Sequence, residues 1–172
     1  MRPIKSAIGD AARVFADALR RETHPLVRGA LAAALGRLRH PDAAAGEAVG
    51  MAVLDVAFPQ DAQGQRRPAS VAVLLGALRG LHSVALAGVR FGAPPRDAAG
   101  RPVTWLPDAA RDAVAALLLD GLAPRSSPSA SLATGAARPA AGITIRRLAV
   151  QVLAGTRRSH PAIGLALIDD PD

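Results

Sequence analysis

Apolar residues recur three or four positions apart along most of this chain, and that spacing predicts helices. The first helix is expected over residues 6–22, where one face carries Ile8, Ala12, Phe15 and Leu19. Most other apolar residues are Ala, Leu and Val, and the aromatic side chains are few. Small side chains favour helix over strand and allow helices to approach closely. The pattern therefore predicts an Ala-rich, mainly helical domain with a thin core.

Histidine–proline pairs precede the next two expected helices. A residue before proline is driven out of the helical region, whereas proline itself suits the first helical turn. His24-Pro25 and His40-Pro41 are therefore interpreted as helix starts. The second helix is expected to run from Pro25 to about Arg39, and the third is expected to begin at Pro41. The end of the third helix stays open, because MAVLDVAF (51–58) also fits a short strand.

The longest nearly unbroken apolar passage is Ala69–Phe91, which follows a polar loop at Pro59–Pro68. Its first half has helical spacing, and Gly80 is expected to end that helix. The residues from Ser83 onward look more like a strand, and Arg101–Leu106 is expected to return as its partner in a β hairpin.

The last third of the chain contains a helix, a linker and an apolar end. Pro107–Gly121 is bounded by helix start and stop signals, and it predicts the best-marked helix. Residues 123–142 are rich in Ser, Pro, Ala and Gly and predict a flexible linker or loop. The β-branched side chains of residues 143–172 include Ile143, Ile145, Val150 and Val152, which favour a hairpin or docking arm. Whether this segment docks on its own core or on a neighbour stays open.

These elements give a fold class and a domain division. The fold class is mainly α with minor β hairpins, and an α+β arrangement remains an alternative. Residues 1–122 are expected to form a helical globular domain, followed by the linker at 123–142 and the apolar segment at 143–172. A search for internal repeats finds no second copy in register, so the sequence predicts no repeat architecture.

The net charge of the chain narrows the classes of partner that it is expected to bind. The formal net charge is +7, and Lys5 is the only lysine among 21 basic residues. A positive chain favours acidic partners, which are nucleic acid or an anionic protein surface.

Arg79, His82 and Arg90 interrupt the central apolar passage and make it a poor membrane span. No secretory signal is visible, and a cytoplasmic protein without membrane contact is expected.

Catalytic and cofactor chemistry finds little support in the sequence. There is no Cys, and no two His residues have the i, i+4 spacing of a zinc-binding helix. Nucleotide-binding glycine loops and a G-x-S-x-G nucleophile motif are absent as well. We therefore expect no catalytic set, metal or cofactor. The residual enzyme hypothesis uses Asp55, which lies among apolar residues, together with His82.

Arginines supply the candidate binding residues. Several occur in pairs or near-pairs that are expected in loops and turns, where they can meet phosphates. The candidates for nucleic-acid contact are Arg20, Arg21, Arg37, Arg39, Arg66, Arg67, Arg146, Arg147, Arg157 and Arg158. Since stacking aromatics are nearly missing, such contact is expected to be independent of base sequence.

The leading hypothesis is a non-enzymatic, small basic subunit or adaptor that assembles with protein partners in a larger complex, where it also touches nucleic-acid backbone. An oligomer is compatible with this interpretation. The alternatives are a direct, sequence-independent nucleic-acid-binding module and an enzyme of unknown class that uses Asp55 and His82.

Overall fold

The computed structural model describes residues 4–90, 98, 100, 103–120, 139–157 and 160–168. Within these ranges the chain forms helices and no strand, apart from one isolated bridge between Gln60 and Arg66. The helices are α1 (Ile4–Arg21), α2 (Pro25–Arg37), α3 (Ala43–Ala57), α4 (Val71–Arg90), α5 (Asp108–Asp120), α7 (Pro139–Gly155) and α8 (Pro161–Ile168).

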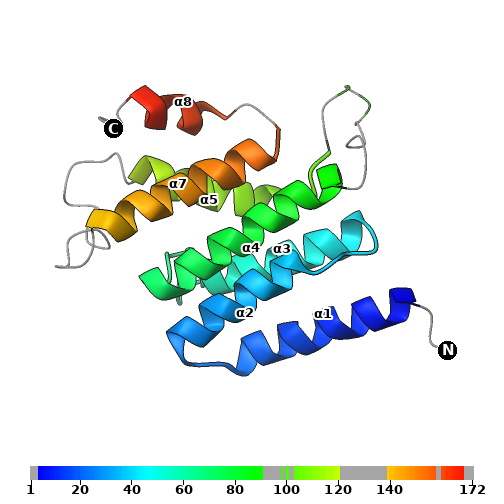
Figure 1. Cartoon of the computed structure of the whole chain (residues 1–172). Helices are drawn as coiled ribbons and strands as arrows, with labels where there is room; N and C mark the ends of the chain where they lie inside the picture. Colours follow the sequence, from blue (N-terminus) through cyan, green and yellow to red (C-terminus); the bar gives the residue numbers. More distant parts are fainter. Residues whose placement is uncertain are drawn as a thin grey trace.

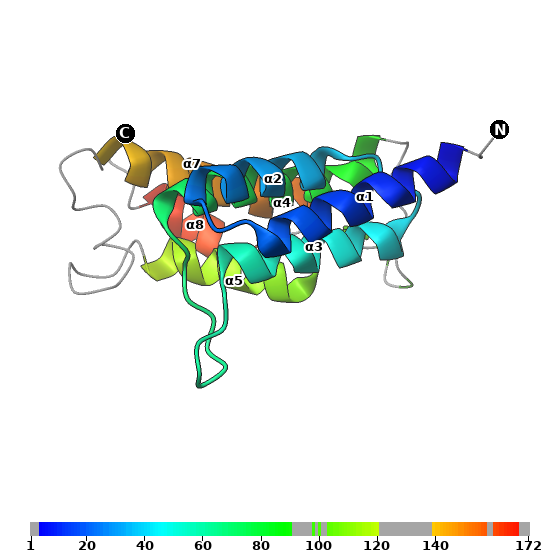
Figure 2. The ribbon, with the colours of Figure 1, turned by 90° about the horizontal axis from the view of Figure 1, so that it is seen from below.

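The first six of these helices form three antiparallel pairs, α1 with α2, α3 with α4, and α5 with α7, stacked side by side (Figure 1). The second helix of each pair lies in one layer, so that α2, α4 and α7 run side by side in the same direction. The first helices, α1, α3 and α5, form the other layer (Figure 2). The short α8 packs against α5 and α7 at one end of the stack. This arrangement is that of a short helical solenoid, although the sequence shows no repeat.

Helix α4 is the centre of the stack, because it packs on α2, α3 and α7. Its inward side chains are fully buried, among them Leu74, Leu78, Leu81 and Val84. They meet the apolar faces of the other helices in one continuous core. The largest fully buried side chains that the other helices contribute include Leu35, Val53, Leu54, Val114, Leu118, Val152 and Leu153. The described part of the central apolar passage therefore supplies the middle of this core.

Glycines allow the backbones of α2 and α4 to touch. A Cβ atom on Gly29 would lie 2.5 Å from the carbonyl oxygen of Ala72, and one on Gly76 would meet the backbone of Gly29. About two turns further along α2, Gly36 faces Gly80 in the same way. Helices that pack through larger side chains keep their axes about 8–10 Å apart. Here the missing side chains let the two helices pack by backbone contact along most of α2.

The expectation that Gly80 ends a helix is wrong, and so is the strand expected from Ser83. Val71–Arg90 is one continuous helix. Gly80 is inside it because the crossing requires a glycine there: a Cβ would meet the carbonyl oxygen of Ala32. The hairpin partner expected at Arg101–Leu106 is not a strand over 103–106, and the remainder of that segment lies outside the described residues.

The terminal hairpin is also wrong, because Pro139–Gly155 and Pro161–Ile168 are helices. Burial against α4 and α5 outweighs the strand preference of the β-branched residues. In a helix, Ile145, Ala149, Val152 and Leu153 share one face, and all four are buried. The last four residues of the expected linker (139–142) belong to α7, and its residues 123–138 lie outside the described part. Docking of the segment on another chain stays a prediction.

The helix starts follow the proline rule with one shift. Helix α2 begins at Pro25 behind an extended His24. Helix α3 begins at Ala43, two residues later than expected, because the carboxylate of Asp42 accepts a hydrogen bond of 2.8 Å from the Ala45 N–H and caps the helix. The segment 51–58 is helical up to Ala57, so its strand alternative is wrong.

Candidate binding surface

Three of the ten candidate arginines are held by carboxylates of their own chain. Arg20 pairs with Asp17 at 2.7 Å on the outside of α1. Arg66 donates to Asp55 at 2.9 Å and to the carbonyl oxygen of Phe58 at 2.9 Å, which ties the loop between α3 and α4 to the end of α3. Arg66 therefore has structural partners that partly compensate its charge. Its neighbour Arg67 pairs with Asp61 and is partly compensated in the same way.

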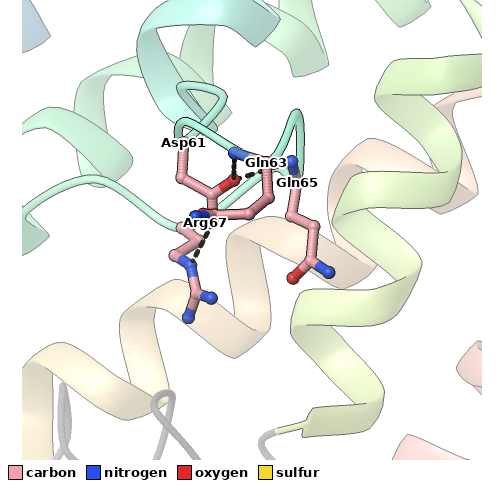
Figure 3. Close-up of polar contacts among 4 residues, drawn as sticks. All are labelled: Asp61, Gln63, Gln65 and Arg67. Atoms are coloured by element: carbon pink, nitrogen blue, oxygen red, sulfur yellow. Dashed lines mark hydrogen bonds and ion pairs between the residues drawn. The ribbon is translucent and has the colours of Figure 1, made fainter.

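Arg67 belongs to a loop centred on Asp61 (Figure 3). One oxygen of the Asp61 carboxylate accepts from the backbone N–H groups of Gln63 and Gln65, at 3.0 and 2.9 Å, and the other lies 2.7 Å from Nε of Arg67. The Arg67 hydrogen bond is the main cause that lowers the pKa of Asp61. These contacts explain the ordered loop and give Asp61 a structural role.

The remaining candidates are scattered. Arg21 and Arg39 are exposed, and Arg39 has a partner within the chain. Arg157 is exposed just after α7 and adopts a left-handed φ of 53°. Arg146 is turned toward the protein, and its Nε and Nη2 are buried without a hydrogen-bond partner. Arg158 lies outside the described residues. The described candidates among the ten arginines therefore lie on several different elements of the chain.

A different arrangement emerges from the distribution of acidic residues. Helices α2, α4 and α7, which form one layer, contain no Asp and no Glu. The opposite layer holds the acidic residues of the helical core, which include Asp17, Glu47, Asp55, Asp108 and Asp112. The acid-free layer nevertheless carries basic side chains on each helix. The acidic side chains of these helices are therefore confined to one layer, whereas arginines occur in both.

Three arginines of the acid-free layer are exposed: Arg37 on α2, Arg79 on α4 and Arg147 on α7. Helix α4 is covered on its other sides by α2, α3 and α7, so its exposed Arg79 must lie on the outer face. We call this surface, defined by Arg37, Arg79 and Arg147, the arginine face. In the part of the chain that the structure describes, none of the three forms an ion pair.

The arginine face was only partly visible in the sequence. Arg37 and Arg147 were candidates, whereas Arg79 was missed because it stands alone in an apolar run. The signal that identifies it is the lack of any carboxylate in Val71–Arg90, which requires the helix bounds to be known.

The proposed enzyme pair is not joined in one site. Asp55 is an exposed residue of α3 and pairs with Arg66. His82 lies on α4 beside the end of α7, where a Cβ on Gly155 would approach its ring at 3.4 Å. His82 has an interaction of its own within the chain. The two side chains therefore face different neighbours.

One hollow of about 250 Å³ lies between the start of α3 and the segment before α5. Its lining includes Trp105, with Glu47 and Asp108 exposed at its rim. Trp105 lies flat on α3 because Gly46 has no side chain, and a Cβ there would lie 2.7 Å from the indole. Among the described residues, no group of three His, Asp or Glu side chains is placed to hold a metal ion.

His40 is the one histidine that is fully buried, at 5% exposure. Burial lowers its pKa, and a hydrogen bond with the backbone of Gly36 opposes that shift only in part. Its Nε2 is buried without a partner. This arrangement keeps the imidazole neutral at the end of α2 and makes it part of the core.

Comparisons of the chain with protein-family models, curated proteins and solved structures gave no match. Within the described residues, no helix combines the length and the apolar content that crossing a bilayer requires.

Proposed function

We propose that this chain is a non-enzymatic basic subunit that assembles with protein partners, and that the arginine face is the surface that meets them. The lack of any acidic residue in α2, α4 and α7, which form one layer, supports this proposal. Stacked helical pairs present extended surfaces of this kind to other proteins. Exposed arginines that form no ion pair with the described residues favour a partner that is acidic where it docks.

The composition of the layer favours protein over nucleic acid as the partner. Helices α2, α4 and α7 contain no Phe, Tyr or Trp on which a base could stack. Exposed apolar side chains accompany the arginines, since Leu26 on α2 is 67% exposed and Ile143 on α7 is 41% exposed. Mixed apolar and arginine surfaces are typical of protein interfaces. Contact with nucleic-acid backbone is the second candidate function, carried by the same three arginines and by Arg157.

The test is a charge reversal of the arginine face. The variant combines Arg37→Glu, Arg79→Glu and Arg147→Glu, and the control reverses Arg13, Arg20 and Arg21 on α1, which gives the same change in net charge. Each protein is immobilised and exposed to an extract of the source cells, with and without nuclease. We expect proteins that wild type and control retain, that the variant loses and that resist nuclease.

Two outcomes contradict the proposal. If nuclease releases every captured protein, the second candidate function is favoured instead. If the arginine-face variant captures the same proteins as wild type, this face is not the binding surface. Removing residues 143–172 is a poorer test of assembly, because it deletes the core side chains of α7 along with any docking function.

A further inference from the structure

We propose that Arg37 and Arg79 together form a carboxylate-binding site on the arginine face, in which the two guanidinium groups hold one acidic side chain of the partner. This inference rests on the proposed function and specifies which part of the face recognises the partner.

The crossing of α2 and α4 brings the two arginines together. Arg37 directly follows Gly36, and Arg79 directly precedes Gly80. Gly36 and Gly80 touch backbone to backbone, with a Cβ on Gly36 placed 2.5 Å from the Cα of Gly80. Adjacent residues of a helix are turned by about 100° from one another. From the shared contact point, each arginine is turned toward the outer face, so both side chains start beside the closest approach of the two helices.

The surroundings leave both charges available. Neither helix contains an acidic residue, and neither Arg37 nor Arg79 forms an ion pair in the described part of the chain. Ser83, one turn after Arg79, uses its hydroxyl to donate to the Arg79 carbonyl oxygen at 3.0 Å and adds no negative charge. Two guanidinium groups near one another repel, and an anion between them relieves the repulsion.

The chemistry of the pair selects its ligand. A guanidinium group presents parallel N–H donors that match the two oxygens of a carboxylate, and two such groups approach one carboxylate from different sides. Arg147 is on α7, which is separated from α2 by α4, and it does not take part in the backbone crossing. It shares the face and the charge but not the site, which makes it a matched control.

The experiment uses the full chain and a defined probe. The probe is a fluorescent amphipathic peptide whose polar face is glutamate, and its control has glutamine at the same positions. Affinity is measured by anisotropy for wild type, Arg37→Gln, Arg79→Gln, the double variant and Arg147→Gln. Each single variant removes one positive charge from an exposed position, and circular dichroism checks that the helices are retained.

We expect the glutamate peptide to bind and the glutamine peptide to bind far more weakly. Arg37→Gln and Arg79→Gln are each expected to weaken binding by about tenfold, as loss of a bidentate charged contact does. The double variant is expected to lose much less than the product of the two effects, because both residues hold the same carboxylate. Arg147→Gln is expected to weaken binding by only about two- to threefold through its exposed charge.

Other results overturn the site. Equal effects of all three single variants, with multiplicative losses in the double variant, would show diffuse charge and would leave the proposed function intact. Failure of the glutamate peptide to bind, with salt-sensitive binding of a generic DNA duplex, would refute both the site and the protein-partner proposal.

Discussion

Replacing Gly29 by alanine tests the central packing feature of this fold, the backbone contact between α2 and α4. The new Cβ would lie 2.5 Å from the carbonyl oxygen of Ala72. Ordinary contacts of this kind begin near 3.4 Å, so the helices must separate locally by about 0.9 Å. The atoms nearest the new Cβ belong to the backbone of Ala72 and Val73 in α4. No side chain can therefore turn away to make room.

The size of the effect follows from two opposing contributions. Overpacking costs about 1–3 kcal/mol, and a backbone obstacle places this substitution at the upper end. Alanine regains about 1 kcal/mol because it favours the helix over glycine. The net loss is therefore about 2 kcal/mol, which lowers the melting temperature by roughly 4–8 °C for a chain of this size.

Thermal unfolding followed by circular dichroism measures this loss. Gly164→Ala is the control, because Gly164 is exposed within α8 and has nothing within 4 Å of its added Cβ. That variant should gain up to about 1 kcal/mol. Should Gly29→Ala be as stable as Gly164→Ala, the close crossing of α2 and α4 would be refuted.

Two further predictions concern a buried histidine and a helix cap. Because burial lowers the pKa of His40, the unfolded chain binds a proton on this imidazole at a higher pH than the folded chain does. The stability that neutral His40 contributes is therefore complete above about pH 6.5 and is lost as pH falls through the lowered pKa. Urea unfolding from pH 7 to pH 5 should thus show a shallower loss for His40→Gln than for wild type, and equal slopes would contradict this. Asp42→Ala should cost about 1 kcal/mol by removing the cap of α3, seen as a lower urea midpoint with an unchanged slope; Glu47→Ala on the same helix should shift it far less.

The sequence predicts the helices whose boundaries are local. Pro25 and the residues around Pro107 lie at helix starts because proline and capping residues act on the adjacent backbone alone. Gly80 could not be interpreted in this way. A glycine ends many helices, but it also allows two helices to touch, and only the position of α2 decides between the two. The β-branched residues of α7 pose the same difficulty, since burial against α4 and α5 decides their structure.

The sequence predicts the candidate site less well than it predicts the helices. Arginine pairs in the sequence indicate residues that are neighbours along the chain, not residues that share a surface. Neighbouring residues of a helix point in different directions. Arg146 and Arg147 are adjacent, yet the first has buried, unpaired nitrogens and the second is exposed. Arg66 and Arg67 are adjacent too, and each is held by a different carboxylate. A surface made of three helices far apart in sequence requires the tertiary arrangement before its members can be identified.

The stacking of the helical pairs also has a consequence for how the chain folds. Helix α2 packs more extensively on α4 than on its own pair partner α1. For α2, the contact between pairs is therefore more extensive than the contact within its own pair. In a stack of this kind a single pair has too little intrinsic stability to persist, and the nucleus must join segments that are distant in sequence. We expect one cooperative transition and slow refolding for a helical protein, because the most extensive interface, between α2 and α4, joins helices that are not consecutive in the sequence.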